Sequence, residues 1–154
     1  APAALQPAPA VVALAQQYAQ TAGSTVVITA DPQQAVAHAD ALYTDVWVSM
    51  GEQVDYGTRI KQLLPFQINA ALLAATGKTS TIVMHCLPAL HDVKTKIGAQ
   101  LGEQYGMTAF EITDDVFQSP QAVVFEEAAN RMPAIKAIMA ATLGNLFIPT
   151  SIFD

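Results

Sequence analysis

The sequence has few charged residues, no run of cations and a single cysteine in 154 residues. Lys and Arg number 7 against 13 Asp and Glu, so the net charge is −6. Phosphate contacts need clustered Lys and Arg, and this balance argues against nucleic acid as a partner. The lone Cys86 cannot form a disulfide within the chain, and no CxxC spacing indicates a metal centre.

Long hydrophobic runs are also missing. No apolar run reaches the ~18 residues of a membrane span, and the first residues carry no basic region typical of a signal peptide. We therefore expect a cytoplasmic protein that does not contact a membrane. Hydrophobic residues nevertheless make up 52% of the chain and charged residues 13%, which predicts that part of the apolar surface meets another domain or subunit.

What the chain does have is an alternation of short apolar runs with segments of helical periodicity. The runs are continuously apolar, which favours a parallel sheet covered by helices on both faces, a doubly wound α/β fold. In such sheets, ligands bind beyond the carboxyl ends of the strands. Strands are expected at 25–29, 42–46, 81–84, 107–112 and 122–125, and helices at 11–18, 31–40, 60–64, 70–75, 94–105, just after Thr113, and at 128–146 with Pro133 near the first turns.

The loop after the 42–46 run carries an acid, a hydroxyl and a glycine turn. Asp45 at a strand end can hold a substrate ammonium by a charge-assisted hydrogen bond. Ser49, Met50 and Gly51 follow with a hydroxyl and backbone groups suited to the polar head of an α-amino acid. The alternative is that Asp45 caps a turn and Ser49 is ordinary loop chemistry.

The loop after the 81–84 run contains His85, Cys86, Leu87 and Pro88. A free cysteine is most often a small buried hydrophobe, but a strand end gives Cys86 access to a ligand. His85 could act as a base or ligand, although a lone histidine is more often structural. A metal site that includes Cys86 and the histidines fits no standard zinc spacing, so we expect no metal.

One cation follows the acidic pair Glu126 and Glu127. Arg131 is expected in the first turn of the last helix, where its guanidinium could bind a carbonyl or phosphate oxygen or simply pair with those acids. No nucleotide-binding or hydrolase motif accompanies it.

Taken together, these segments resemble the ornithine carbamoyltransferases over about residues 5–146. The Ser-Met-Gly loop is similar to that of the ornithine enzymes rather than to their putrescine and aspartate relatives. The matching segments are Tyr43-Thr-Asp-Val-Trp-Val-Ser-Met-Gly51, Pro65-Phe-Gln-Ile-Asn69, Met84-His-Cys-Leu-Pro-Ala89 with His91-Asp92, Thr113-Asp-Asp-Val-Phe117, and Val124-Phe125 through Asn130-Arg131-Met132.

The resemblance implies a function for each loop. Asp45, Ser49 and Met50 would hold the α-amino acid head of L-ornithine. Cys86 and Leu87 would lie at carbamoyl phosphate and the reacting δ-nitrogen, with Cys86 as a suggested proton acceptor, His85 and the cis-bonded Pro88 in support, and Arg131 on carbamoyl phosphate. The products would be L-citrulline and phosphate, and no cofactor or metal is implied. Both the biosynthetic and the degradative enzymes share these loops, so the metabolic direction stays open.

The resemblance also implies an organisation. The fold would be a Rossmann-like sheet that here lacks its first two strands, with an ornithine-binding domain at 1–126. Residues 127–154 would pack on a carbamoyl-phosphate domain, whose Ser-Thr-Arg-Thr and His-Pro-x-x-Gln motifs do not occur in this sequence. We therefore expect this chain to be the C-terminal part of an enzyme whose other part lies in the same polypeptide or a separate one. The family's catalytic unit is a homotrimer.

Two departures surround Arg131. Ala129 stands where the family usually has Glu, and Pro133 where it usually has His. We therefore keep two interpretations. The chain is part of an enzyme and is inactive alone, or it is a catalytically silent domain that binds an amino acid or serves regulation or oligomerisation.

Overall fold

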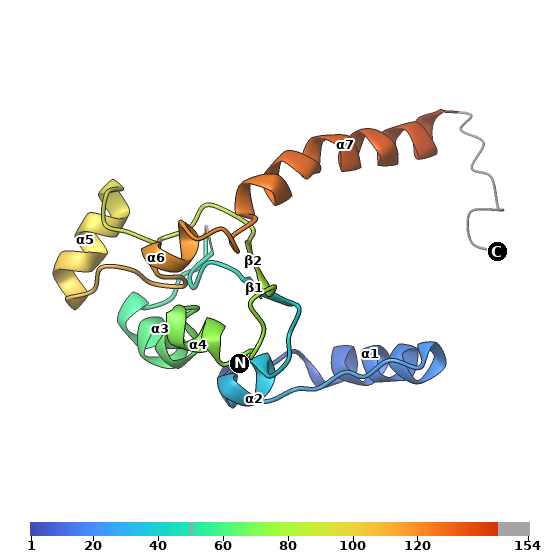
Figure 1. Cartoon of the computed structure of the whole chain (residues 1–154), viewed down its shortest axis with the longest axis horizontal. Coiled ribbons are helices and arrows are strands. Elements are labelled where there is room, and N and C mark those ends of the chain that lie inside the picture. The colour runs from blue at the N-terminus through green and yellow to red at the C-terminus, as the bar shows by residue number, and fades with distance from the viewer. Residues whose placement is uncertain (50, 145–154) are drawn as a thin grey trace.

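The computed structural model describes residues 1–49 and 51–144. Two helices, α1 and α7, extend as arms from a body that contains the sheet and the remaining helices (Figure 1). The elements in chain order are a 3-10 turn Ala3–Leu5, α1 (Pro9–Ala22), α2 (Pro32–Val36), β1 (Ala41–Thr44), α3 (Tyr56–Leu63), a 3-10 turn Leu64–Phe66, α4 (Ala70–Ala74), β2 (Ile82–His85), α5 (Lys96–Tyr105), α6 (Asp114–Phe117) and α7 (Val124–Leu143).

The sheet is parallel, as predicted. Strands β1 and β2 pair from Ala41↔Ile82 to Thr44↔His85, so both carboxyl ends lie at the same edge. Two of the expected strands are present only as single parallel bridges, Ile68↔Ile112 and Val83↔Ala122. The chain therefore has an α/β fold with a small parallel sheet flanked by helices.

The prediction of a strand at 122–125 is wrong beyond its first residue. The β-branched pair Val123 and Val124 favours a strand, but Glu127 N–H bonds Val123 O and the chain has already become helical. Glu126 and Glu127 suit the positive end of this helix. The expected strand at 25–29 has no strand partner among the described residues, so its β-branched side chains did not suffice to form one.

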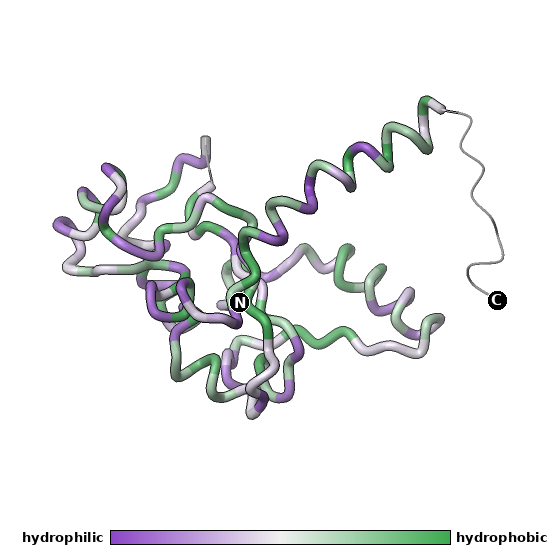
Figure 2. Tube along the Cα trace, turned by 45° about the horizontal axis from the view of Figure 1, so that its top comes forward, coloured by the Kyte–Doolittle hydropathy of each residue, from purple (hydrophilic) through white to green (hydrophobic). Residues whose placement is uncertain are grey.

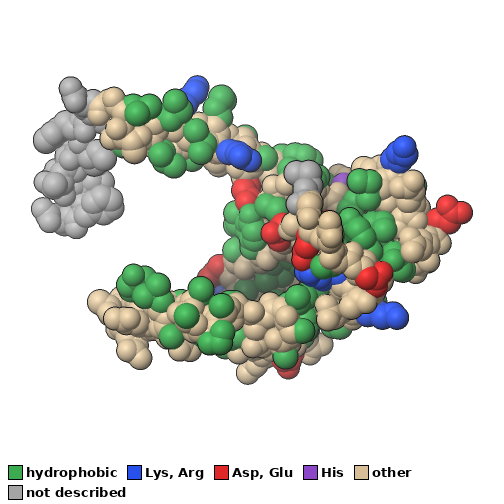
Figure 3. All heavy atoms as spheres, turned by 180° about the vertical axis from the view of Figure 1, so that it is seen from behind, with side chains coloured by type: hydrophobic (Ala, Val, Ile, Leu, Met, Phe, Trp, Pro, Cys, Tyr) green, Lys and Arg blue, Asp and Glu red, His purple; other side chains and the backbone are tan. Residues whose placement is uncertain are grey.

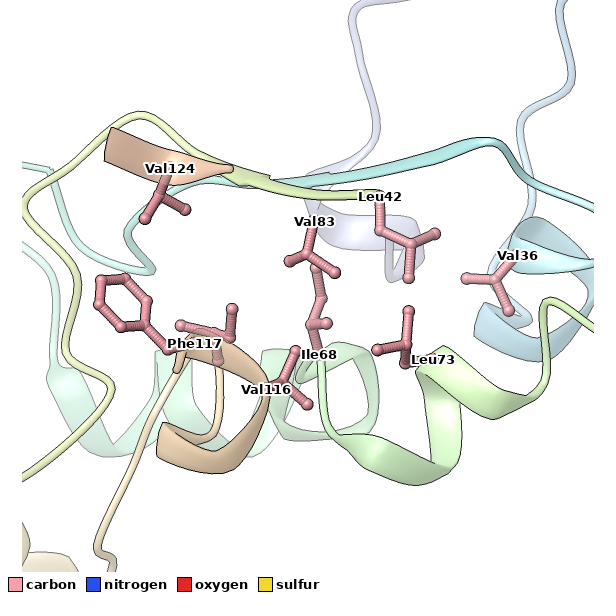
Figure 4. Packing of buried hydrophobic residues seen from close by; sticks show 9 residues of the cluster. Val36, Leu42, Ile68, Leu73, Val83, Val116, Phe117 and Val124 are labelled. Carbon is pink, nitrogen blue, oxygen red and sulfur yellow. The ribbon is translucent and has the colours of Figure 1, made fainter. Parts of the chain in front are cut away.

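Side chains from one face of the sheet form the main core. Leu42 and Val83 point toward α4 and α6, where Leu73, Val116 and Phe117 meet them (Figure 4). The opposite face is open in the described structure, because Tyr43 is 57% exposed and Ile82 38% exposed. A second cluster joins Trp47, Ile60, Leu101 and Phe110.

Local sequence signals set most helix ends. Asp31 accepts the N–H groups of Gln33 and Gln34, and Asp55 accepts that of Thr58, which fixes the starts of α2 and α3. Gly23 ends α1 in the left-handed conformation, with φ 66°. Helix α2 stops at Val36 rather than near residue 40.

Helix α7 starts earlier than the sequence pattern indicates. Its first residue is Val124, so Pro133 lies in the helix interior and Arg131 lies beyond the first turn. Both expectations about these positions are corrected by the early start. An interior proline removes one backbone hydrogen bond, and here the helix continues past it.

Hydrophobic residues recur along both arms (Figure 2), and many of them are exposed. Seen from behind, they border a hollow in which apolar side chains gather (Figure 3). None of the described helices is long and apolar enough to cross a membrane. The exposed apolar residues of the arms include Val11, Leu14, Tyr18, Met132, Ile135, Ile138, Met139 and Leu143.

Candidate functional site

A cavity of about 390 Å³ opens beyond the carboxyl ends of the two strands. The chain leaves β1 at Thr44 and β2 at His85, and the loops that follow form two of its walls. This is the position predicted from the parallel sheet. The lining residues are Asp45, Val46, Trp47, Val48, Ser49, Gly51, Glu52, Tyr56, Ile60, Cys86, Leu87, Pro88, Leu90, Ile97, Leu101, Phe110 and Glu111.

Asp45 and Cys86 meet at this cavity. Because Thr44 is paired with His85, the next residue of each strand lies beside the other, and Cys86 Sγ is 2.8 Å from Asp45 Oδ1. The same carboxylate oxygen accepts the Val46 N–H at 2.7 Å. Partial burial, and then the hydrogen bond to Asp45, raise the pKa of the Cys86 thiol. The thiol is therefore protonated at neutral pH and donates to Asp45.

His85 is buried behind the thiol, at 1% exposure. Its Nδ1 accepts the Leu87 N–H at 2.9 Å and so carries no proton. The proton is then on Nε2, which lies 3.3 Å from Glu111 Oε1. Glu111 Oε1 also accepts the Leu90 N–H at 2.6 Å. A neutral imidazole thus fixes the loop that presents Cys86.

Glu111 was not among the residues selected from the sequence. It is fully buried and lines the cavity together with Phe110. The available signal was an acid inside the apolar run 109–112, where the burial of a charge requires partners.

The loop after Cys86 has unusual backbone geometry. The Leu87–Pro88 peptide bond is cis, as predicted from the family resemblance, and Leu87 has φ 52°. A positive φ is uncommon for a residue with a branched side chain, and such conformations cluster at ligand sites. Leu87 and Pro88 both line the cavity.

Ser49 lies in a tight turn on the opposite wall. The Glu52 N–H donates to Ser49 O at 3.1 Å, and Gly51 supplies the positive φ of 84° within the turn. Ser49 N–H donates in return to Glu52 Oε2 at 3.2 Å. Met50, which was also expected to contact ligand, lies outside the described residues.

Arg131 is not brought to this cavity. Its side chain is exposed on α7 and is not among the lining residues. The pairing with Glu126 or Glu127 considered from the sequence is also absent among the ion pairs of residues 1–49 and 51–144.

A second polar cluster lies on the outside of the same loop. His91 Nδ1 is 2.7 Å from Asp114 Oδ1, and its ring stacks on Phe117 with 3.8 Å between centroids. Asp92 binds Lys94 Nζ at 2.9 Å. These contacts join the loop to α6.

The cavity combines an acidic mouth with an apolar interior. Asp45 can accept N–H bonds from an ammonium group, and the Cys86 thiol lies in contact with that carboxylate. Trp47 and Phe110, packed edge to face with centroids 6.4 Å apart, form part of the apolar wall. The geometry suits a small molecule with a cationic amine and a short aliphatic chain.

Known proteins share both the sequence and the fold. The family model described as the aspartate/ornithine carbamoyltransferase Asp/Orn-binding domain matches residues 1–142. An ornithine carbamoyltransferase of Lactiplantibacillus plantarum is 90% identical over 99% of this chain, which covers 45% of that protein. A catabolic ornithine carbamoyltransferase of Latilactobacillus sakei is 53% identical over 97% of the chain and 44% of its own length.

Among solved structures, the ornithine carbamoyltransferase from Pyrococcus furiosus has a TM-score of 0.76 at 36% identity. The match covers 95% of this chain and 41% of that one. The chain therefore spans less than half the length of these relatives.

Proposed function

We propose a function on the premise that the chain belongs to the aspartate/ornithine carbamoyltransferase family, whose amino-acid-binding domain model matches residues 1–142. The chain supplies the ornithine-binding part of an ornithine carbamoyltransferase. The reaction is attack of the neutral δ-amine of L-ornithine on the carbamoyl carbon of carbamoyl phosphate, which gives L-citrulline and phosphate. No cofactor enters this proposal.

The observation that carries the proposal is the Asp45–Cys86 contact at the cavity mouth. Asp45 holds the amino group of ornithine, and the Ser49 turn receives the remainder of its α-amino acid head. Met50 is proposed beside them on the family resemblance alone. The apolar wall near Trp47 suits the methylene chain of the substrate.

Deprotonation of the amine follows from the same contact. The Cys86 thiol is already protonated, because burial and Asp45 raise its pKa. It can accept a proton from the δ-amine only while it passes its own proton to Asp45, so the pair acts as one acceptor. Leu87 and the backbone fixed by Pro88 and His85 form the carbamoyl phosphate edge of the site.

The remaining machinery is proposed to come from a carbamoyl-phosphate domain, in the same polypeptide or a separate one. The exposed apolar residues of α7 support this, since a surface of that kind is typical of an interface. Residues 1–126 then act as the amino-acid domain and 127–154 as the connection, with Arg131 turned toward carbamoyl phosphate after docking. A homotrimer in the cytoplasm is the proposed assembly, and the surface thiol of Cys86 suits a reducing compartment.

The experiment is a chimera. Residues 1–154 replace the matching segment of the Lactiplantibacillus plantarum relative, and citrulline formation is followed with both substrates. Activity comparable to that of the relative supports the proposal. An inactive chimera that still binds the ornithine analogue L-norvaline would instead favour the silent binding domain, with Ala129 and Pro133 as the first positions to revert.

A further inference from the structure

One carboxylate ties the Ser49 turn to helix α3. Glu52 Oε2 accepts the Ser49 N–H at 3.2 Å, while the other oxygen, Oε1, pairs with the Arg59 guanidinium. The Glu52 N–H closes the turn on Ser49 O at 3.1 Å. Glu52 therefore links the Ser49 turn in the cavity wall to Arg59 on helix α3.

Arg59 is a firm anchor for this connection. Its side chain is only 16% exposed, and its neighbour Ile60 is buried in the cluster that includes Trp47 and Phe110. Hydrogen bonds from the Ser49 N–H and then from Arg59 lower the pKa of Glu52, so its charge persists at neutral pH. The turn is thus linked through a charged pair to the core beneath the cavity.

We propose that Glu52 and Arg59 are positioning residues that set the affinity for the α-amino acid head group. The inference rests on the proposed function and extends it to Glu52, which binds the Ser49 backbone, and to Arg59, which pairs with Glu52. A turn that is already fixed binds without the entropic cost of ordering it. Loss of the connection leaves the carbamoyl phosphate edge of the site, on the Cys86 loop, unchanged.

The test separates the two substrates. In the active chimera, Glu52→Ala and Arg59→Met should each raise the KM for ornithine about 10-fold, the effect expected for one charge-assisted hydrogen bond. The KM for carbamoyl phosphate should stay within about 2-fold, the scale of an uninvolved surface position. Matched controls are Glu103→Ala and Lys96→Met, two exposed charges on α5 that do not line the cavity.

A charge exchange distinguishes positioning from simple pairing. The double variant Glu52→Arg with Arg59→Glu can restore the ion pair and the melting temperature, but it leaves Ser49 N–H without its acceptor. We expect its ornithine KM to remain high, whereas Glu52→Asp should recover part of the affinity. Full recovery of KM in the exchanged variant would overturn the role of the Ser49 contact.

Failure of this inference differs from failure of the function. An active chimera whose ornithine KM does not change in Glu52→Ala overturns the inference alone, and so does an equal rise in both KM values, which would indicate a general structural role. If the chimera makes no citrulline, the function fails. The inference is then decided by L-norvaline affinity, followed by fluorescence of the single Trp47 in the cavity wall. Unchanged affinity in both variants would overturn it.

Discussion

The body and the arms of this molecule use their apolar residues in opposite ways. In the body, Ile112 and Val83 are fully buried and even the polar pair His85 and Glu111 is enclosed and hydrogen-bonded. Along α7, the apolar side chains of Ile135, Ile138 and Leu143 are exposed. Figure 3 shows hydrophobic side chains along both arms, and an exposed apolar patch of this kind is typical of an interaction site. The body buries its apolar side chains, although Glu111 Oε2 has no hydrogen-bond partner among the described residues, and the arms leave most of theirs exposed.

This difference indicates where the chain is self-sufficient. The body holds the Cys86 loop, one wall of the cavity, in place through hydrogen bonds from the Leu87 and Leu90 N–H groups to His85 and Glu111. None of the residues that line the cavity lies on α7, although Val124 at the start of that helix packs in the main core. The arms supply none of the residues that line the cavity, so changes in the two regions should affect different measurements.

The largest effect is expected in the body. Asp45→Asn removes the charge that holds the α-amino group of ornithine and also the final acceptor of the δ-amine proton, and we expect citrulline formation by the chimera to fall about 1,000-fold. The matched control is Asp40→Asn at the other end of β1, where the carboxylate is 89% exposed. A loss of less than about 10-fold would show that Asp45 is not the acceptor.

The contrast in packing is tested by one substitution made twice. Ile112→Ala should lower the free energy of unfolding by about 3 kcal/mol, because it opens a cavity in the core. Ile138→Ala, at 58% exposure, should change it by less than about 0.5 kcal/mol. Denaturant unfolding of the two variants measures both values. Equal losses would contradict the description of Ile138 as a side chain that does not pack against the body.

Sequence patterns predicted the body better than the arms. The adjacency of Asp45 and Cys86 follows from two parallel strands of similar length, and the pattern gave both strands to within about two residues, the usual uncertainty of an element boundary. The sequence did not indicate Glu111, because its role depends on a contact with His85, 26 positions away in sequence, which no local pattern contains.

The arms were harder to predict for a physical reason. Residues 122–125 favour a strand by composition, but backbone bonding beyond Val123 makes a helix, and this shift moved Arg131 and Pro133 deeper into α7. Residues 25–29 favour a strand as well, yet a strand forms only where a neighbour offers its hydrogen bonds. The secondary structure of such segments depends on the neighbouring segments that they contact, and local propensity contains no information about those contacts.

A smaller effect is expected when the apolar surface of α7 is changed. Ile135→Asp should weaken association of this chain with a separately produced carbamoyl-phosphate domain of the Lactiplantibacillus plantarum relative by about 10-fold, a modest interface effect. Its unfolding free energy should not change, since the side chain is exposed. Lys136→Gln on the same helix is the control. Titration of citrulline formation against domain concentration measures the affinity, and an unaltered titration would refute a docking role for Ile135.

The smallest effect concerns the single thiol, which makes it unambiguous to measure. Burial is the larger cause of the raised Cys86 pKa, and the bond to Asp45 is the second. Asp45→Asn removes the carboxylate charge but leaves the burial, so alkylation by iodoacetamide at pH 8 should become about 3-fold faster as the thiolate fraction rises. The raised pKa also means that the folded chain binds this proton more tightly than the unfolded chain does. The corresponding stabilisation is present below the ordinary thiol pKa of 9.0 and is lost as pH rises through the higher folded value. If the alkylation rate of Cys86 in Asp45→Asn is unchanged or lower, the Asp45 carboxylate does not hold the thiol proton.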